Sequence, residues 1–268
     1  MPAPNRNRQL PMMSYAQQGE DVVLRRAFAG LTDGFYVDVG AAWPVVDSVT
    51  KYFYEKGWRG INIEPNPQVF AELVVDRPQD INLQVAIAPE AGEVTLSVFP
   101  RVEGWSTTTD EIRQRHEALG LETKAVQVPA KPLNDILVEH AASKRIAFIK
   151  IDVEGAERGV LESLDLKRWK PGVLVVEATE PGSPEPSHAD WEPIIIGQGY
   201  KLAQFDGLNR WYALDAALLE AASLPPNSFD EYIPYKWWQL IPRAEQQKVI
   251  DRLQTKYGCS VDFPLNTV

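Results

Sequence analysis

The sequence predicts an α/β fold with an open, doubly wound and mostly parallel sheet of seven strands. Its apolar runs are short, rich in β-branched residues and separated by amphipathic stretches. That pattern is typical of a parallel sheet covered by helices on both faces. Only "DGLN" separates the last two runs, and Asp206-Gly207 favours a tight hairpin. The sheet should therefore end in an antiparallel pair.

The predicted elements alternate along the chain, as a doubly wound sheet requires. The expected strands cover residues 35–40, 60–65, 81–88, 146–152, 172–178, 200–206 and 210–214. One helix is expected from a capping Asp47 or Ser48 to Gly57, and another over 66–76 with Pro67 in its first turn.

The remaining segments predict three further parts. Residues 93–131 combine a strand, the polar loop "GWSTTT", a helix and a second strand, which indicates an insertion or an extension of the sheet. Residues 1–30 are expected to form a helical segment over the ligand site, and residues 31–215 the main domain. Residues 216–268 are expected to form a helical tail that acts as a structural cap or an oligomer contact.

Composition narrows the class of protein. The chain has 268 residues, of which 44% are apolar and 24% charged, as in a globular protein. The net charge of -10 disfavours nucleic acid as a partner. The single Cys259 excludes an intrachain disulfide, and no apolar run approaches the roughly 18 residues of a membrane span. We expect a cytoplasmic protein without a membrane span, with homo-oligomerisation as an open alternative.

Polar residues at the carboxyl ends of the first two strands predict a nucleoside site, because ligands of such sheets bind there. The first strand ends in "VDVGAAWP", where Asp38, Gly40 and Ala41 form a turn of small residues. Glu64 follows roughly twenty positions later, where an acid accepts both hydroxyls of a ribose. We include Pro65 and Ser48, which flank these features, among the predicted contacts.

The form of the turn favours a mononucleoside over a dinucleotide. "GAAWP" lacks the second glycine that lets backbone amides reach a pyrophosphate. A nucleoside cofactor without pyrophosphate suggests S-adenosylmethionine, with Asp38 and the turn amides at its methionine end. Val85 and Ala86, at the end of the third expected strand, are predicted beside the adenine.

Several linked motifs resemble the FkbM family of class I methyltransferases. They are "SYAQQGED", "FYVDVGA" with "GWRGINIEPNP", "GWSTTT", "IKIDVEGAE" and "DGLNRWY", in family order from about residue 14 to 214. The resemblance implies a Rossmann-like methyltransferase sheet, O-methylation of sugar or polyketide-type hydroxyls, and an N-terminal segment that folds over the cofactor with Gln17 facing the site. Trp43 in the turn and the last 50 or so residues depart from the pattern.

Three carboxylates are predicted to carry the chemistry. Asp152 and Glu154 leave the fourth expected strand, and Glu177 ends the next one. Removing a proton from a hydroxyl requires a base or a metal, so one acid should have a raised pKa, or Asp152 and Glu177 should bind Mg²⁺. Asp152 is also a predicted cofactor contact. Glu157 is expected only to begin a helix.

Further residues are candidate contacts to the acceptor. Trp105, with Ser106 and Thr107, would stack on and bond a sugar face, although a tryptophan beside a turn is as often a packing anchor. His116 is a candidate base, against the alternative of a solvated helical histidine. Asn209 and Arg210 in the closing hairpin are candidate acceptor contacts.

These observations predict an S-adenosylmethionine-dependent O-methyltransferase that acts on a hydroxyl of a sugar, a glycoside or a related small molecule. Two alternatives keep the fold. One is a nicotinamide-dependent oxidoreductase, against which the missing second glycine argues. The other is a non-catalytic nucleoside-binding scaffold, against which the acids Glu64 and Asp152 argue.

Overall fold

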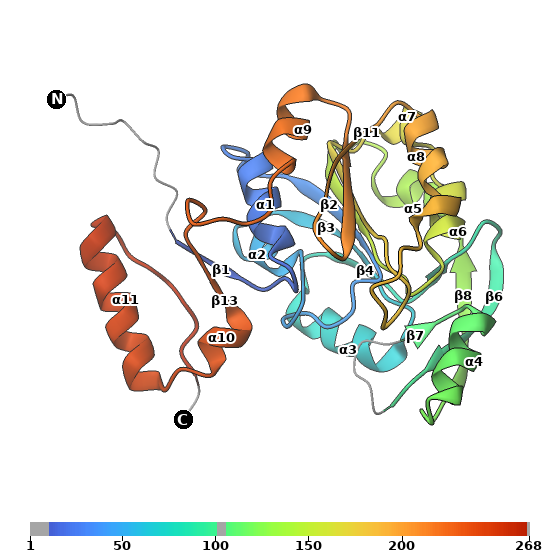
Figure 1. The fold of residues 1–268 in the computed structure, drawn as a ribbon, viewed down its shortest axis with the longest axis horizontal. Coiled ribbons are helices and arrows are strands. Elements are labelled where there is room, and N and C mark those ends of the chain that lie inside the picture. The colour runs from blue at the N-terminus through green and yellow to red at the C-terminus, as the bar shows by residue number, and fades with distance from the viewer. Residues whose placement is uncertain (1–10, 101–105, 267–268) are drawn as a thin grey trace.

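The main sheet has seven strands, five of them parallel neighbours (Figure 1). The computed structural model describes residues 11–100 and 106–266. In spatial order the strands are β11 (Lys201–Phe205), β12 (Asn209–Ala213), β10 (Val173–Glu177), β9 (Ile146–Ile151), β2 (Phe35–Val39), β3 (Arg59–Ile63) and β4 (Ile81–Leu83). The five strands β10, β9, β2, β3 and β4 run parallel to one another. β12 runs antiparallel to both of its neighbours, β10 and β11. The α/β class is confirmed, with a mixed sheet.

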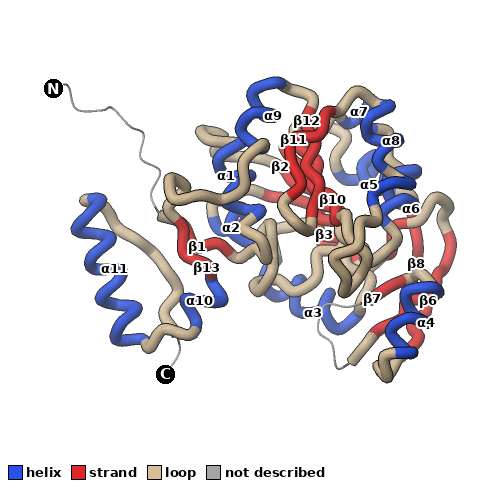
Figure 2. The backbone as a smooth tube through the Cα atoms, in the orientation of Figure 1, coloured by secondary structure: helices blue, strands red, loops and turns tan. Residues whose placement is uncertain are grey.

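Helices cover both faces of this sheet, as doubly wound topology requires (Figure 2). One face packs against α1 (Glu20–Ala27), α2 (Lys51–Glu55) and α9 (Ala216–Ala222), whose Leu24, Phe53 and Ala222 belong to a single apolar core. The other face packs against α5 (Leu133–His140), α6 (Glu157–Glu162), α7 (Leu166–Trp169) and α8 (Glu192–Gly197). The short 3₁₀ turn η1 (His188–Asp190) precedes α8, and α3 (Pro67–Asp76) follows β3.

The helix expected over 47–57 is shorter, because α2 begins at Lys51 after Thr50. Asp47 has a φ of 62°, in the left-handed region. The Ser48 hydroxyl is bonded to Arg77 at 3.0 Å instead of capping the helix. Residues 41–50 therefore form an irregular loop after β2, and this loop forms part of the candidate site.

The strand expected over 81–88 is wrong as a single element. Its first part is β4 in the main sheet, and its last part is β5 (Ala86–Ile87) in a separate four-stranded sheet with β8 (Lys124–Lys131), β6 (Gly92–Val98) and β7 (Ser106–Thr107). An apolar run in the sequence does not indicate where the chain leaves one sheet and enters another. Here Ala86 packs on Leu96 and Val128 in a small core of its own. α4 (Asp110–Ala118) connects β7 to β8.

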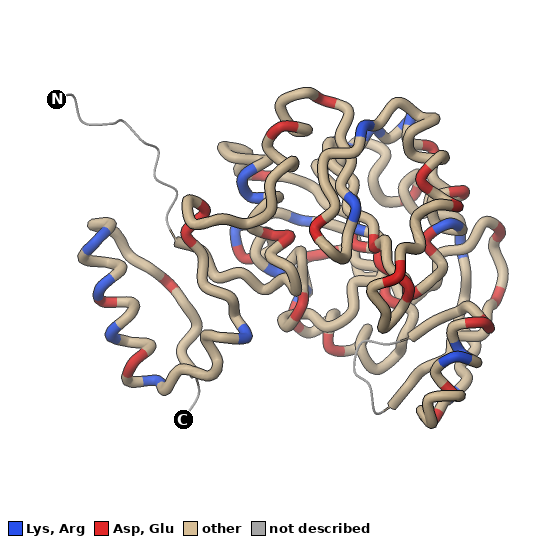
Figure 3. The backbone as a smooth tube through the Cα atoms, viewed as in Figure 1, with Lys and Arg blue, Asp and Glu red and all other residues tan. Residues whose placement is uncertain are grey.

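The N-terminal strand pairs with a segment of the C-terminal tail in a small parallel sheet. β1 (Met12–Ser14) pairs with β13 (Tyr232–Pro234), so residues 1–30 contain a strand as well as the expected helix. α10 (Tyr235–Gln239) and α11 (Arg243–Tyr257) follow, and Trp238 and Ile250 share an apolar core with Met13. Figure 3 shows Lys and Arg alternating with Asp and Glu along α11, as on a solvated helix.

Among residues 11–100 and 106–266, no helix has both the length and the apolar character needed to cross a bilayer. The expected cytoplasmic location and homo-oligomerisation stay predictions.

Candidate functional site

Gly40 brings the ends of two strands together. It follows β2 with a φ of 75°, and its N–H and that of Ala41 both donate to the carbonyl of Ile63 at 3.0 Å. A Cβ at this position would lie 1.7 Å from the carbonyl oxygen of Asp152, which follows β9. Gly40 was predicted in a turn of small residues at the ligand site. In the structure it is required by the approach of Asp152.

A cavity lies beyond the carboxyl ends of β2, β3 and β9, and we call it the first cavity. Of the predicted cofactor contacts, those that line it are Gly40, Glu64, Pro65, Val85, Ala86 and Asp152. Its other polar lining includes Asn66, Ser106, Thr108 and Glu154, and its apolar lining includes Val69, Ile87 and Leu96. The combination of an apolar wall and a few convergent polar groups suits a nucleoside.

Glu64 is held in place by two backbone amides. Ala42 N–H donates to Oε2 at 2.9 Å, and Asn66 N–H donates to Oε1 at 2.8 Å. Burial raises the pKa of Glu64 to about 7, against the opposing effect of these two bonds. Each carboxylate oxygen keeps capacity for a second hydrogen bond, so the pair remains able to accept two ligand hydroxyls.

Lys150 lies among the acids at the end of β9. Its ammonium donates to the Gly40 carbonyl at 2.6 Å and lies 3.2 Å from Asp152 Oδ2 and 3.6 Å from Asp38 Oδ1. Burial opposes the lysine charge, but Asp152 and Asp38 outweigh it and raise the pKa of Lys150. Burial also raises the pKa of Asp38, against the effect of Lys150 and of Thr50, whose hydroxyl donates to it at 2.8 Å.

Four predicted cofactor contacts lie outside the first cavity, and one of them, Gln17, lines a second cavity. Asp38 is 1% exposed and contacts Lys150 and Thr50, so it lies beneath the residues that line the cavity. Ala41 and Ser48 are also buried and do not line it. Ala42, the residue after the predicted turn contact, lines the cavity instead.

A second, more polar cavity adjoins the first. Its lining includes Gln17, Lys150, Glu177 and Thr179, and Ala42, Asp152 and Glu154 line both cavities. The three predicted catalytic acids therefore meet in one place, and two of them form part of the shared boundary. Gln17, a predicted cofactor contact, reaches the second cavity from the N-terminal segment and does not line the first.

Burial and mutual repulsion perturb these acids. Burial, then Asp152 and Glu157, raise the pKa of Glu154 to about 8, and its φ of 53° places it in the left-handed region. Burial, then the neighbouring acids, raise the pKa of Glu177 well above its ordinary value. Glu177 Oε2 is buried without a hydrogen-bond partner among the described residues. Such perturbation is typical of functional carboxyls.

Glu157 has the structural role that was expected. It is the first residue of α6, and its Oε1 accepts the amides of Val153 and Gly155 at 3.1 and 3.2 Å. Burial raises its pKa to about 7, and the amide bonds oppose that shift. It lines neither cavity.

The predicted Mg²⁺ site is not supported. Within the described ranges, no group of three or more His, Cys, Asp or Glu side chains is arranged to hold a metal ion. The Lys150 ammonium lies beside Asp152 at 3.2 Å and supplies positive charge where a cation was expected.

The predicted acceptor contacts separate into two groups. Ser106 lines the first cavity, where its hydroxyl accepts from Asn66 at 3.2 Å, and Thr107 donates to the carbonyl of Glu154 at 2.8 Å. His116 lies far from solvent, edge-on to Phe99 at 4.8 Å, and burial lowers its pKa. It lines neither cavity, so it was wrongly expected at the site. Trp105 lies outside the described residues.

Asn209 and Arg210 also lie outside both cavities. Asn209 donates to Glu20 at 2.9 Å and so ties the final hairpin to the helix that follows Gln17. Arg210 pairs with Glu192 at 3.0 Å. The hairpin is therefore linked to the N-terminal segment through Asn209, and Leu208 is its residue that lines the second cavity.

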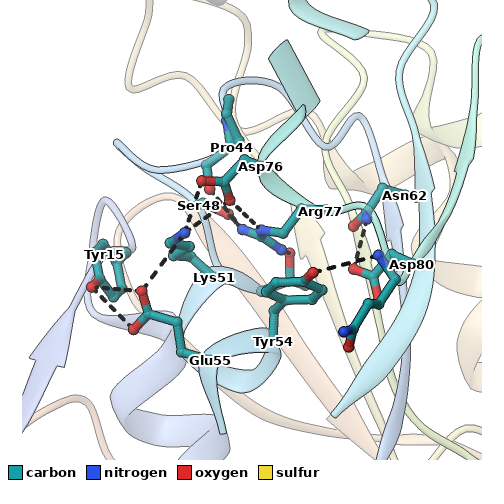
Figure 4. Close-up of polar contacts among 12 residues, drawn as sticks. Tyr15, Pro44, Ser48, Lys51, Tyr54, Glu55, Asn62, Asp76, Arg77 and Asp80 are labelled. Atoms are coloured by element: carbon teal, nitrogen blue, oxygen red, sulfur yellow. Dashed lines mark hydrogen bonds and ion pairs between the residues drawn. The ribbon is translucent and has the colours of Figure 1, made fainter. Parts of the chain in front are cut away.

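Arg77 is a positioning residue that the sequence did not indicate. It is fully buried at the end of α3, and it donates to the Pro44 carbonyl at 2.7 Å, to Ser48 at 3.0 Å and to Thr50 at 3.3 Å (Figure 4). Asp76 balances its charge at 2.9 Å. Arg77 thus fixes the 41–50 loop, which contributes to both cavities.

The fold and the site define a class before any comparison is made: an α/β protein with a cavity at the carboxyl edge of its sheet that adjoins an acidic pocket. The model of the methyltransferase FkbM domain matches residues 38–202, which is more than half of the chain. The chain belongs to the FkbM family of S-adenosylmethionine-dependent methyltransferases.

Two curated relatives are methyltransferases of fungi. "Methyltransferase 1" of Beauveria bassiana is 30% identical over 154 residues, 51% of this chain and 61% of that protein. "Methyltransferase sdnD" of Sordaria araneosa is 30% identical over 199 residues, 63% of this chain and 74% of that protein. The chain thus spans less than two thirds of the length of the first relative.

Solved structures give more distant likenesses. One is a TehB-like S-adenosylmethionine-dependent methyltransferase of Corynebacterium glutamicum, with 10% identity, a TM-score of 0.39 and coverage of 72% of this chain and 86% of that one. Another is the fibrillarin pre-rRNA processing protein of Methanococcus jannaschii, with 13% identity, a TM-score of 0.35 and coverage of 77% and 70%.

Proposed function

We propose that the protein is an S-adenosylmethionine-dependent O-methyltransferase that acts on a hydroxyl of a sugar, a glycoside or a related small molecule. The observation that carries this proposal is the meeting of two cavities at Ala42, Asp152 and Glu154. The first cavity suits a nucleoside, and the second cavity presents acids and amides to a polar acceptor. Methyl transfer needs the two reactants side by side, and adjoining cavities supply that proximity.

The residues of the first cavity fit the cofactor. Glu64 would accept the ribose hydroxyls, because two amides fix its orientation and leave capacity for further bonds. Val85 and Ala86 would lie against the adenine. The cofactor, when bound, supplies an activated methyl group, so the protein has to orient the acceptor and remove its proton.

Glu154 is the base that we propose for this proton. It lines both cavities, and a pKa of about 8 suits a carboxylate that must take a proton from a hydroxyl near neutral pH. Glu177 lines the second cavity, where its carboxyl group would orient the hydroxyl. Lys150 compensates part of the negative charge through Asp152.

The first experiment separates cofactor classes. Calorimetry with S-adenosylhomocysteine should show binding, and a parallel titration with NAD should not. Binding of NAD without S-adenosylhomocysteine would establish the oxidoreductase alternative and overturn the proposal.

The second experiment tests the base. Methyl-labelled cofactor and a panel of glycosides are incubated with the protein, and the products are identified by mass spectrometry. The rate should rise with pH through about 8 as Glu154 loses its proton, and Glu154→Gln should abolish that rise while it still binds S-adenosylhomocysteine. Glu117→Gln, which changes an exposed acid on α4, is the control. An unchanged pH profile in Glu154→Gln would refute the assignment of the base.

A further inference from the structure

The C-terminal segment forms one wall of a groove beside the candidate site. The groove lies between the loop of residues 14–19 and residues 232–237, and it includes Gln17, Gln18, Tyr232, Tyr235 and Trp237. The pairing of β1 with β13 holds the two segments together. The FkbM match ends at residue 202, so this wall comes from outside the matched domain.

The groove adjoins the second cavity. Gln17 lines both. Asp47 lines the second cavity and Lys236 lines the groove, and their side chains form an ion pair at 2.8 Å. A backbone bridge between Ala16 and Asp47 joins the N-terminal loop to the 41–50 loop at the same place. An acceptor that fills the second cavity and extends past this ion pair would therefore reach the groove.

The groove combines aromatic faces with amide side chains. Trp237 is 69% exposed, whereas its neighbour Trp238 is fully buried in the small C-terminal core. The Tyr235 ring is held by Tyr15 at 5.0 Å between centroids. Aromatic faces pack against the apolar face of a ring, and the two glutamine amides are able to bond hydroxyls at its edge. These properties suit a second sugar or aryl ring.

We propose that this groove binds the second ring of a glycoside acceptor whose methylated sugar occupies the second cavity. The inference rests on the proposed function and narrows its substrate class from free sugars to glycosides of at least two rings. Trp237 is the main specificity residue, because it offers the largest exposed aromatic face in the groove.

The experiment compares acceptors that differ only in the second ring. Methyl glycosides of common hexoses and their p-nitrophenyl counterparts are offered with methyl-labelled S-adenosylmethionine, and KM and kcat are measured by mass spectrometry of the products. The p-nitrophenyl glycoside should have a KM about tenfold lower, equivalent to about 1.4 kcal/mol. Trp237→Ala should remove this advantage without changing kcat or the affinity for S-adenosylhomocysteine.

Phe229→Ala is the matched control, since Phe229 is 88% exposed and does not line the groove. Equal KM values for the two acceptor series, or an advantage that survives in Trp237→Ala, would overturn the inference and leave the proposed function intact. Failure of the protein to methylate either series while it binds S-adenosylhomocysteine would overturn the glycoside acceptor and, with it, the groove assignment.

Discussion

Gly40→Ala tests whether the approach of β2 to Asp152 organises the site. An alanine at the observed φ of 75° costs about 1 to 2 kcal/mol from the left-handed conformation alone. Its Cβ would also meet the Asp152 carbonyl oxygen at 1.7 Å, and such overpacking costs about 1 to 3 kcal/mol more. We expect a loss of roughly 2 to 5 kcal/mol in the free energy of unfolding.

Gly30→Ala is the matched control, because Gly30 has a φ of 91° and an added Cβ would have no atom within 4 Å. Gly30→Ala should lose only the cost of the left-handed conformation, about 1 to 2 kcal/mol in the free energy of unfolding. Both variants are measured by urea unfolding followed by circular dichroism, and by calorimetry with S-adenosylhomocysteine. Gly40→Ala should also weaken binding, since the displaced turn and Asp152 line the first cavity. Equal unfolding free energies and equal affinities in the two variants would refute the reasoning.

Three further predictions concern the buried charges. Glu64→Gln should weaken S-adenosylhomocysteine binding about ten- to a hundredfold in calorimetry, because bonds to a charged group contribute about 1.5 to 3 kcal/mol; an affinity equal to that of the exposed-site control Glu72→Gln would contradict it. Arg77→Lys should lower both the thermal midpoint and this affinity, because lysine lacks the planar fork that bonds the 41–50 loop; wild-type values for both would contradict it. Glu20 and Glu64 have pKa values of about 7 in the fold, raised mainly by burial from 4.5, so the folded state binds more protons than the unfolded state between these values. Their contribution to stability is present below about pH 4.5 and is lost as pH rises through 7, so urea unfolding should show stability falling from about pH 5 to pH 7; a rise over that range would contradict it.

The sequence predicted most element types of the main sheet, and it placed Gly40 and Glu64 at one edge of that sheet. Strands and helices of the main sheet follow from local apolar patterns, which do not depend on distant contacts. Gly40 and Glu64 were indicated because their spacing along two successive strands fixes their positions at one edge of a parallel sheet. The same rule brought Asp152 and Glu177 to that edge, and the structure places them together.

Other features required the tertiary structure, because they depend on contacts between residues far apart in the chain. His116 has the sequence context of a solvated helical residue, yet it is buried against Phe99. Arg77 follows a helix without any motif, and only the folded 41–50 loop gives it its partners.

The sequence by itself determined the family, the α/β class and the acids that meet at the carboxyl edge of the sheet, since those depend on short-range pattern and strand order. Only the tertiary structure decided that Lys150 also reaches Asp38 and the Gly40 carbonyl from the neighbouring strand, and that the C-terminal segment returns beside Gln17. Both arrangements depend on how side chains from separate elements pack together, and the local sequence pattern does not predict that packing.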